Sequence, residues 1–316
     1  MNSRVKELDF LKCIFIILMI IFHLVYIGDS YPYAKQVVYT FHMSAFLVIS
    51  GYLNNVNKKI KAFGRNLLWI FIPYVCMETG YVIMSAILPV REKITELSAG
   101  LLLHKAIIAP MGPYWYLHTL MLCNASYYLM YRMTNKWKGI TRFILLGILL
   151  YGLSELKLLT FANAIYFLAG VAIRQSGSNI IRIFQPNLLA LFPLIILCYF
   201  PENLNRGTLA GVTITYLVIS LLLAIYTYLT EQIKKILLYI GSNTLVILLF
   251  SPVFTLLSKL YLPLFTFDAT GICFTIVSVV FVICGCFGVT YIFDRLHISP
   301  YFLGKKQMLP PYSSAD

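Results

Sequence analysis

The sequence predicts an all-α, polytopic membrane protein, a helical bundle with about ten transmembrane helices. Three observations lead to this class: 60% of the 316 residues are apolar, only 12% are charged, and the mean hydropathy is +0.81. An average soluble domain is roughly 45–50% apolar and about 25% charged. A soluble globule therefore has too little interior for this chain.

The basic residues outnumber the acidic ones by 25 to 12, which gives a net charge of +13. Nucleic-acid binding would need these residues on one soluble face, but they form short clusters between apolar runs. We therefore expect a lipid bilayer and no nucleic acid among the partners. The seven cysteines also fall inside apolar runs, which argues against a disulfide framework or a metal site.

A helical span needs about 20 mostly apolar residues. Ten segments approach this requirement, near 8–27, 37–53, 66–88, 114–131, 143–156, 160–173, 188–200, 208–229, 236–258 and 270–292. The fifth, sixth and seventh are short. Two interpretations of residues 143–173 stay open: two tilted helices, or one span broken at Lys157, which would invert the orientation of every later segment.

Lysine and arginine near the ends of spans stay preferentially in the cytoplasm. With ten spans and a cytoplasmic N-terminus, 18 of the 25 basic residues fall on the cytoplasmic side. This bias favours ten spans with both termini cytoplasmic. Because no repeat or long hydrophilic stretch interrupts the chain, we expect one transmembrane domain over residues 1–304, followed by a flexible cytoplasmic tail over 305–316.

The first segment carries Asp9, Lys12 and His23, and ionisable groups inside a span are costly enough to indicate function by default. Asp9 and Lys12 are three residues apart, so they can pair on one helix face. His23 follows Lys12 by eleven positions, which is close to three turns and about 16 Å of rise. Both side chains would then line one lumen, although a structural ion pair and a helix-bonding histidine are the plainer interpretations.

Polar groups in three later segments are further candidates. His42 and Ser50 lie in the second, where an interfacial histidine and a hydroxyl bonded across helices are the plainer interpretations. Glu78 lies in the third among apolar neighbours, so it must be paired or protonated. Tyr114 and Trp115 begin the fourth, where an interfacial aromatic belt competes with a surface for stacking a sugar ring.

Taken together, the chain resembles the acyltransferase 3 family of integral membrane acyltransferases. The resemblance rests on an ordered set of motifs, namely Leu8–Lys12, the Lys12 to His23 spacing, Phe41–Gly51, Arg65–Pro73, Trp115–Leu117, Phe167–Gly170 and Ile240–Leu245. The chain departs from the family pattern at three positions. Lys12 stands where members commonly have arginine, Ser44 replaces a proline, and Ser251 stands about where a histidine is expected.

The resemblance implies a membrane O-acyltransferase of the bacterial cytoplasmic membrane. It would move an acyl group, most commonly acetyl, from cytoplasmic acyl-CoA to a hydroxyl of a cell-surface or lipid-linked glycan. Acyl-CoA, most commonly acetyl-CoA, is then a donor substrate, with no permanently bound cofactor and no metal.

For this reaction we expect the following roles for the candidates. His23 is expected as general base, since its ordinary pKa suits proton transfer, with Glu78 orienting it or Lys12. Lys12 and Arg65 would bind the phosphates of CoA. The substrate-binding candidates are His42, Ser50, Tyr114 and Trp115.

Two other classes fit a ten-span protein with buried charges. A transporter or flippase of a glycan or lipid-linked substrate is the main alternative, although no inverted repeat and no paired broken helices are visible in the sequence. A membrane scaffold without chemistry is the other, and the Lys12 and His23 alignment disfavours it.

Overall fold

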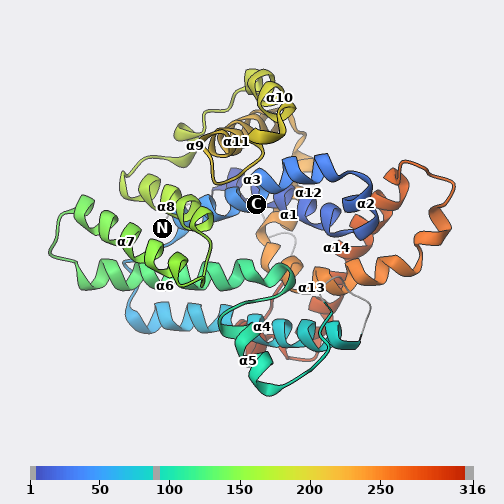
Figure 1. Cartoon of the computed structure of the whole chain (residues 1–316), viewed down its shortest axis with the longest axis horizontal. Coiled ribbons are helices and arrows are strands. Elements are labelled where there is room, and N and C mark those ends of the chain that lie inside the picture. Colours follow the sequence, from blue (N-terminus) through green and yellow to red (C-terminus); the bar gives the residue numbers. More distant parts are fainter. Residues whose placement is uncertain (1–4, 88–92, 310–316) are drawn as a thin grey trace.

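The computed structural model describes residues 5–87 and 93–309 of the chain, and all regular structure within them is helical (Figure 1). This confirms the all-α prediction. The α-helices are α1 (Lys6–His23), α2 (Val25–Ser30), α3 (Pro32–Leu53), α4 (Ile60–Ile87), α5 (Ala99–Ile107), α6 (Trp115–Met133), α7 (Gly139–Glu155), α8 (Phe161–Gln175), α9 (Ile180–Ile183), α10 (Leu191–Tyr199), α11 (Leu209–Tyr228), α12 (Glu231–Ser242), α13 (Thr244–Leu257), α14 (Ile272–Arg295) and α15 (Ser299–Phe302).

Each of the ten expected segments coincides with a helix or a helix pair. By length and apolarity, four helices of the described residues are able to cross a membrane, namely α3, α4, α11 and α14. A fifth span arises if α12 and α13 together form one. The chain is thus an all-helical membrane protein. These criteria support four or five spans among the described residues, fewer than the ten expected.

The expected span over 236–258 is wrong as one continuous helix. The chain bends by 79° between α12 and the helix that follows it. The break lies at Asn243, whose side-chain amide donates a hydrogen bond to the Tyr239 carbonyl at 2.8 Å. Asparagine side chains compete in this way with backbone hydrogen bonding, so they favour helix ends.

Residues 143–173 form two antiparallel helices, so the interpretation as one broken span is also wrong. Lys157 lies between α7 and α8 with a φ of 58°, a left-handed conformation that turns the chain back. The rings of Tyr151 and Phe161 then pack across the turn with centroids 5.6 Å apart. This hairpin keeps the chain direction that the ten-segment interpretation requires.

Helix α1 lies at the centre of the bundle, with neighbours α3, α11, α12, α13 and α14. Close backbone approach fixes two of the crossings. At the α3–α8 crossing, a Cβ added to Gly51 would lie 2.2 Å from the Phe167 carbonyl oxygen. At the α1–α12 crossing, a Cβ on Gly241 would lie 1.8 Å from the Asp9 carbonyl oxygen. Only glycine permits these approaches, which allow neighbouring helices to pack tightly.

The last described residues contact α14. The backbone N–H groups of Met308 and Leu309 donate to the Asp294 carboxylate at 2.8 and 3.2 Å, and Met308 is buried. Met308 and Leu309 are therefore held by α14. The rest of the expected tail lies outside the described residues.

Candidate active site

One face of α1 borders two cavities in succession. Lys12 and Ile16 line the first, a hollow of about 350 Å³. Met19 and His23 line the second, which has an inner part of about 150 Å³ and an outer part of about 880 Å³. The four residues are spaced by four, three and four positions, the spacing that keeps side chains on one face of an α-helix. Lys12 and His23 thus lie on one face of α1 as expected, but they line two adjoining hollows and not the single lumen that the sequence predicted.

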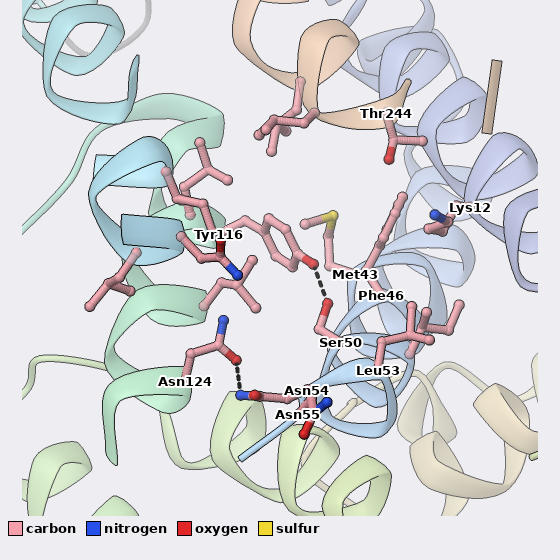
Figure 2. Close-up of a pocket in the computed structure, with 18 of the residues that line it drawn as sticks. Lys12, Met43, Phe46, Ser50, Leu53, Asn54, Asn55, Tyr116, Asn124 and Thr244 are labelled. Atoms are coloured by element: carbon pink, nitrogen blue, oxygen red, sulfur yellow. Dashed lines mark hydrogen bonds between the residues drawn. The ribbon is translucent and has the colours of Figure 1, made fainter. Parts of the chain in front are cut away.

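The first cavity, which we call the Lys12 cavity, has both polar and apolar side chains in its lining (Figure 2). Its residues come from α1, α3, α4, α6 and α13 and from the loop after α3. Hydrogen bonds join Ser50 to Tyr116 at 2.9 Å and Asn54 to Asn124 at 2.6 Å across it. The residues that bear polar side chains are Lys12, Ser50, Asn54, Asn55, Lys58, Asn66, Tyr116, Asn124 and Thr244.

The expected pair of Asp9 and Lys12 is confirmed. The Lys12 Nζ lies 2.6 Å from Asp9 Oδ1, and the Lys12 side chain is 20% exposed. Asp9 is buried, so the pair anchors the ammonium group at the edge of the cavity. Lys12 keeps donors for a further anion, since an ammonium group has three.

The geometry of His23 defines which ring nitrogen faces the second cavity. Its Nδ1 lies 2.7 Å from the Met19 carbonyl oxygen, and a carbonyl only accepts hydrogen bonds. Nδ1 therefore carries the proton, and in the neutral ring Nε2 keeps a lone pair. Helix α1 ends at this residue because Leu24 adopts an extended conformation, with a ψ of 110°. The imidazole thus lies at the negative end of the helix dipole.

A second histidine has the same arrangement beside it. The Nδ1 of His42 donates to the Val38 carbonyl at 2.8 Å. The ring of Tyr39 neighbours both imidazoles, with its centroid 6.3 Å from that of His23 and 5.1 Å from that of His42. All three side chains line the inner part of the second cavity, which we call the His23 cavity.

Trp115 and Arg206 complete the inner part of the His23 cavity. The Arg206 guanidinium carbon lies 5.8 Å from the centroid of the Trp115 ring. Partial burial lowers the pKa of Arg206 from its ordinary value, so a neighbouring anion would relieve a desolvation cost. Ser251, at the position where the resemblance led us to expect a histidine, is buried and lines the outer part.

The structure therefore divides the eight sequence candidates into three groups. His23, His42 and Trp115 share the His23 cavity, and Lys12 and Ser50 share the Lys12 cavity. The remaining three line neither cavity, namely Arg65, Glu78 and Tyr114.

Those three residues lie where other contacts explain their positions. Arg65 is exposed on α4. Glu78 is fully buried and accepts a hydrogen bond from the Met111 backbone N–H at 2.6 Å. Tyr114 is buried and donates to the Leu249 carbonyl at 2.8 Å. Glu78 and Tyr114 thus hold both sides of the short turn that leads into Trp115.

Several cavity residues were not identified from the sequence. Arg206 lies in a loop, and Tyr39 was one aromatic among many, so neither had a local signal. The run Asn54-Asn55-Val56-Asn57-Lys58 was a usable signal, because three amides and a cation at the end of an apolar span are polar enough to mark a cavity rim. Met43 and Leu248, which border both cavities, had no signal beyond apolarity.

The described residues thus form an all-helical bundle with cationic and histidine-bearing cavities along one helix. Comparison with family models identifies the class of protein: the family described as acyltransferase domain matches residues 5–291, nearly the whole chain. The chain belongs to this acyltransferase family, as the sequence resemblance implied. No curated protein and no solved structure gives a match.

Proposed function

We propose that the protein is a membrane O-acyltransferase that moves an acyl group, acetyl in the first instance, from cytoplasmic acyl-CoA to a hydroxyl of a cell-surface or lipid-linked glycan. The observation that carries this proposal is the face of α1 that borders the Lys12 cavity and then the His23 cavity. It offers a cation for the donor and a base for the acceptor along one line.

The Lys12 cavity is the proposed donor site. Lys12 and Lys58 supply positive charge, which forms charge-assisted hydrogen bonds with phosphate oxygens. The asparagine amides at the rim offer further donors. The rise of about 16 Å from Lys12 to His23 matches an extended pantetheine arm with its thioester at the imidazole. Arg65, outside the cavity, would act only on phosphate groups that extend from the rim.

His23 is the proposed general base. Its Nε2 lone pair would take the proton of the acceptor hydroxyl while that oxygen attacks the thioester carbonyl carbon. The tetrahedral intermediate would collapse with cleavage of the carbon–sulfur bond, and the imidazolium would return the proton to the CoA sulfur. The Met19 carbonyl and the end of the helix dipole both stabilise the transient imidazolium.

The His23 cavity is the proposed acceptor site. Trp115 offers an apolar face for a sugar ring, and His42 offers a second imidazole within the same inner hollow. Glu78 and Tyr114 act in this proposal by positioning the turn before Trp115, through Met111 and Leu249. Ser50 belongs to the donor cavity and not to the acceptor one.

The proposed setting is the bacterial cytoplasmic membrane, with ten spans and both termini in the cytoplasm. The ten helical segments and the antiparallel α7–α8 hairpin support this topology, as does the distribution of basic residues. The Lys12 end of α1 would then face the cytoplasm, where acyl-CoA is made, and the His23 end would face the outside.

The test is CoA release from acetyl-CoA by the detergent-purified protein in the presence of glycan acceptors. His23→Ala should abolish the signal at equal yield and equal monodispersity. His104→Ala is the matched control, because His104 is an exposed histidine on α5 that lines neither cavity. Equal release by wild type and His23→Ala, or none from wild type over a panel of acyl-CoAs and glycans, would point to a transporter or flippase instead.

A further inference from the structure

The outer opening of the His23 cavity is surrounded by cations. Lys35, Lys93 and Lys259 line its outer part, and Arg206 lines its inner part. Lys35 and Arg206 also flank a third hollow, of about 540 Å³, that adjoins the same opening. They come from four separate places in the chain. No aspartate or glutamate of the described residues lines any of these hollows.

The charges of these four residues are not neutralised within the part of the chain that the structure describes. None of them forms an ion pair there. Lys35 Nζ lies 5.5 Å from the Tyr39 ring centroid, and Arg206 lies beside Trp115. Aromatic faces attract cations but leave the full positive charge in place. The opening therefore has a positive field that low-dielectric walls intensify.

The distribution of basic residues makes this grouping informative. In the proposed topology the outside has only 7 of the 25 lysine and arginine residues, because basic residues resist translocation. Four of those seven line the hollows around His23. Cations that were merely tolerated on the outer surface would be spread over it, as Lys105 on α5 and Lys157 in the turn after α7 are.

We propose that the acceptor is an anionic glycan, bound through an oxyanion group by Arg206 and Lys35. This inference rests on the proposed function and specifies its acceptor. A sugar ring stacked on Trp115 places its charged substituent within reach of the neighbouring guanidinium, whose planar fork suits carboxylate and phosphate oxygens. Lys93 and Lys259, both exposed, attract the anion toward the opening.

Two kinds of glycan supply this chemistry: an acidic sugar with a carboxylate, and a lipid-linked sugar with a pyrophosphate. The experiment measures kcat/KM for acetyl transfer to three acceptors, a glucuronic-acid oligosaccharide, a glucose oligosaccharide of the same length, and a prenyl-linked sugar pyrophosphate. Comparison of the glucuronic-acid oligosaccharide with the glucose oligosaccharide tests whether a carboxylate is recognised. Comparison of the sugar pyrophosphate with the glucose oligosaccharide tests whether a phosphate is recognised. The wild type is compared with Arg206→Gln, Lys35→Gln and the control Lys157→Gln, an exposed outer residue that lines none of these hollows.

We expect the wild type to prefer one of the anionic acceptors by about tenfold or more, as a charge-assisted hydrogen bond implies. Arg206→Gln and Lys35→Gln should each bring the ratio of kcat/KM for the anionic acceptor to kcat/KM for the neutral acceptor toward one. Lys157→Gln should leave this ratio unchanged. A ratio near one in the wild type, or an equal loss in the control, would overturn the anionic acceptor. Transfer that still depends on His23 would then leave the proposed function standing.

A second measurement keeps the inference testable if no acceptor turns over. Titration calorimetry of the purified protein with the glucuronic-acid oligosaccharide and with inorganic pyrophosphate reports binding without catalysis. Binding that Arg206→Gln abolishes and Lys157→Gln preserves supports the anion site even if the proposed function fails. If neither anion binds to the wild type, the proposed anion site is overturned.

Discussion

Met43 on α3 and Leu248 on α13 each border both the Lys12 cavity and the His23 cavity, and they are the residues that the two hollows share. Two apolar side chains thus form the partition between the proposed donor and acceptor sites. Methionine is flexible and unbranched, so this partition can yield to a narrow chain such as an acylated pantetheine arm.

The partition leads to a steric prediction. Met43→Trp should fill the passage and lower acetyl transfer by about a hundredfold, comparable with the effect of misplacing a reacting group. CoA should still bind in the Lys12 cavity, because Lys12 and Lys58 remain in its lining. Met43→Leu conserves volume and should keep most activity. Steady-state transfer and equilibrium CoA binding check both, and a fully active Met43→Trp variant would contradict the passage.

Lys12 should act on the donor. We expect Lys12→Gln to raise KM for acetyl-CoA by about tenfold through loss of a charge-assisted contact, with KM for the acceptor unchanged. Lys12→Arg should preserve donor binding or improve it, because the guanidinium binds phosphate through two bonds. Lys61→Gln, which removes a cation outside both cavities, is the control. An equal rise of this KM in the control would mean that the effect comes from general surface charge and not from a contact of Lys12 with the donor.

Trp115 should act on the acceptor. Trp115→Ala removes the proposed stacking face, so KM for the glycan should rise by about tenfold while KM for acetyl-CoA stays constant. Trp115→Phe should recover part of the affinity. Trp137→Ala is the matched control, since Trp137 is 55% exposed and lines neither cavity. A rise in KM for acetyl-CoA with KM for the glycan unchanged would contradict the assignment of Trp115 to the acceptor site.

The α3–α8 crossing should be intolerant of a single methyl group. A Cβ on Gly170 would lie 2.0 Å from the Val48 carbonyl oxygen, so the helices must separate. Overpacking of this kind costs roughly 1–3 kcal/mol, which corresponds to a loss of about 5 °C in apparent melting temperature. Gly80→Ala meets no atom within 4 Å and should be neutral or stabilising. Thermal unfolding in detergent of both variants at equal detergent concentration tests the difference.

The relation between Lys12 and His23 was predictable because helical periodicity is local. Eleven residues of unbroken apolar helix fix the face and the rise without knowledge of any neighbour. The motif that contains His42 and the aromatic run at Trp115 were also visible as polar or aromatic departures from an apolar background. Polar or aromatic residues that differ from the apolar residues around them can be identified from one sequence.

The features that escaped prediction depend on how helices meet. The partition requires α13 to approach α3. The group of cations around the His23 cavity requires Arg206, from a loop far along the chain, to reach Trp115. Arg65 was expected at the donor site, but its direction depends on the rotation of α4 about its axis. The break at Asn243 had a local signal in Gly241-Ser242-Asn243, and the strong apolar run that follows it concealed that signal.

Transfer across a sealed membrane tests the two-cavity route most directly. Acetyl-CoA labelled in the acetyl group is enclosed in proteoliposomes that contain the protein, and the glycan acceptor is supplied only outside. We predict labelled glycan outside, CoA retained inside, and loss of the product with His23→Ala. Product that forms only when donor and acceptor share one compartment would contradict the passage of the acyl group from the Lys12 cavity to His23.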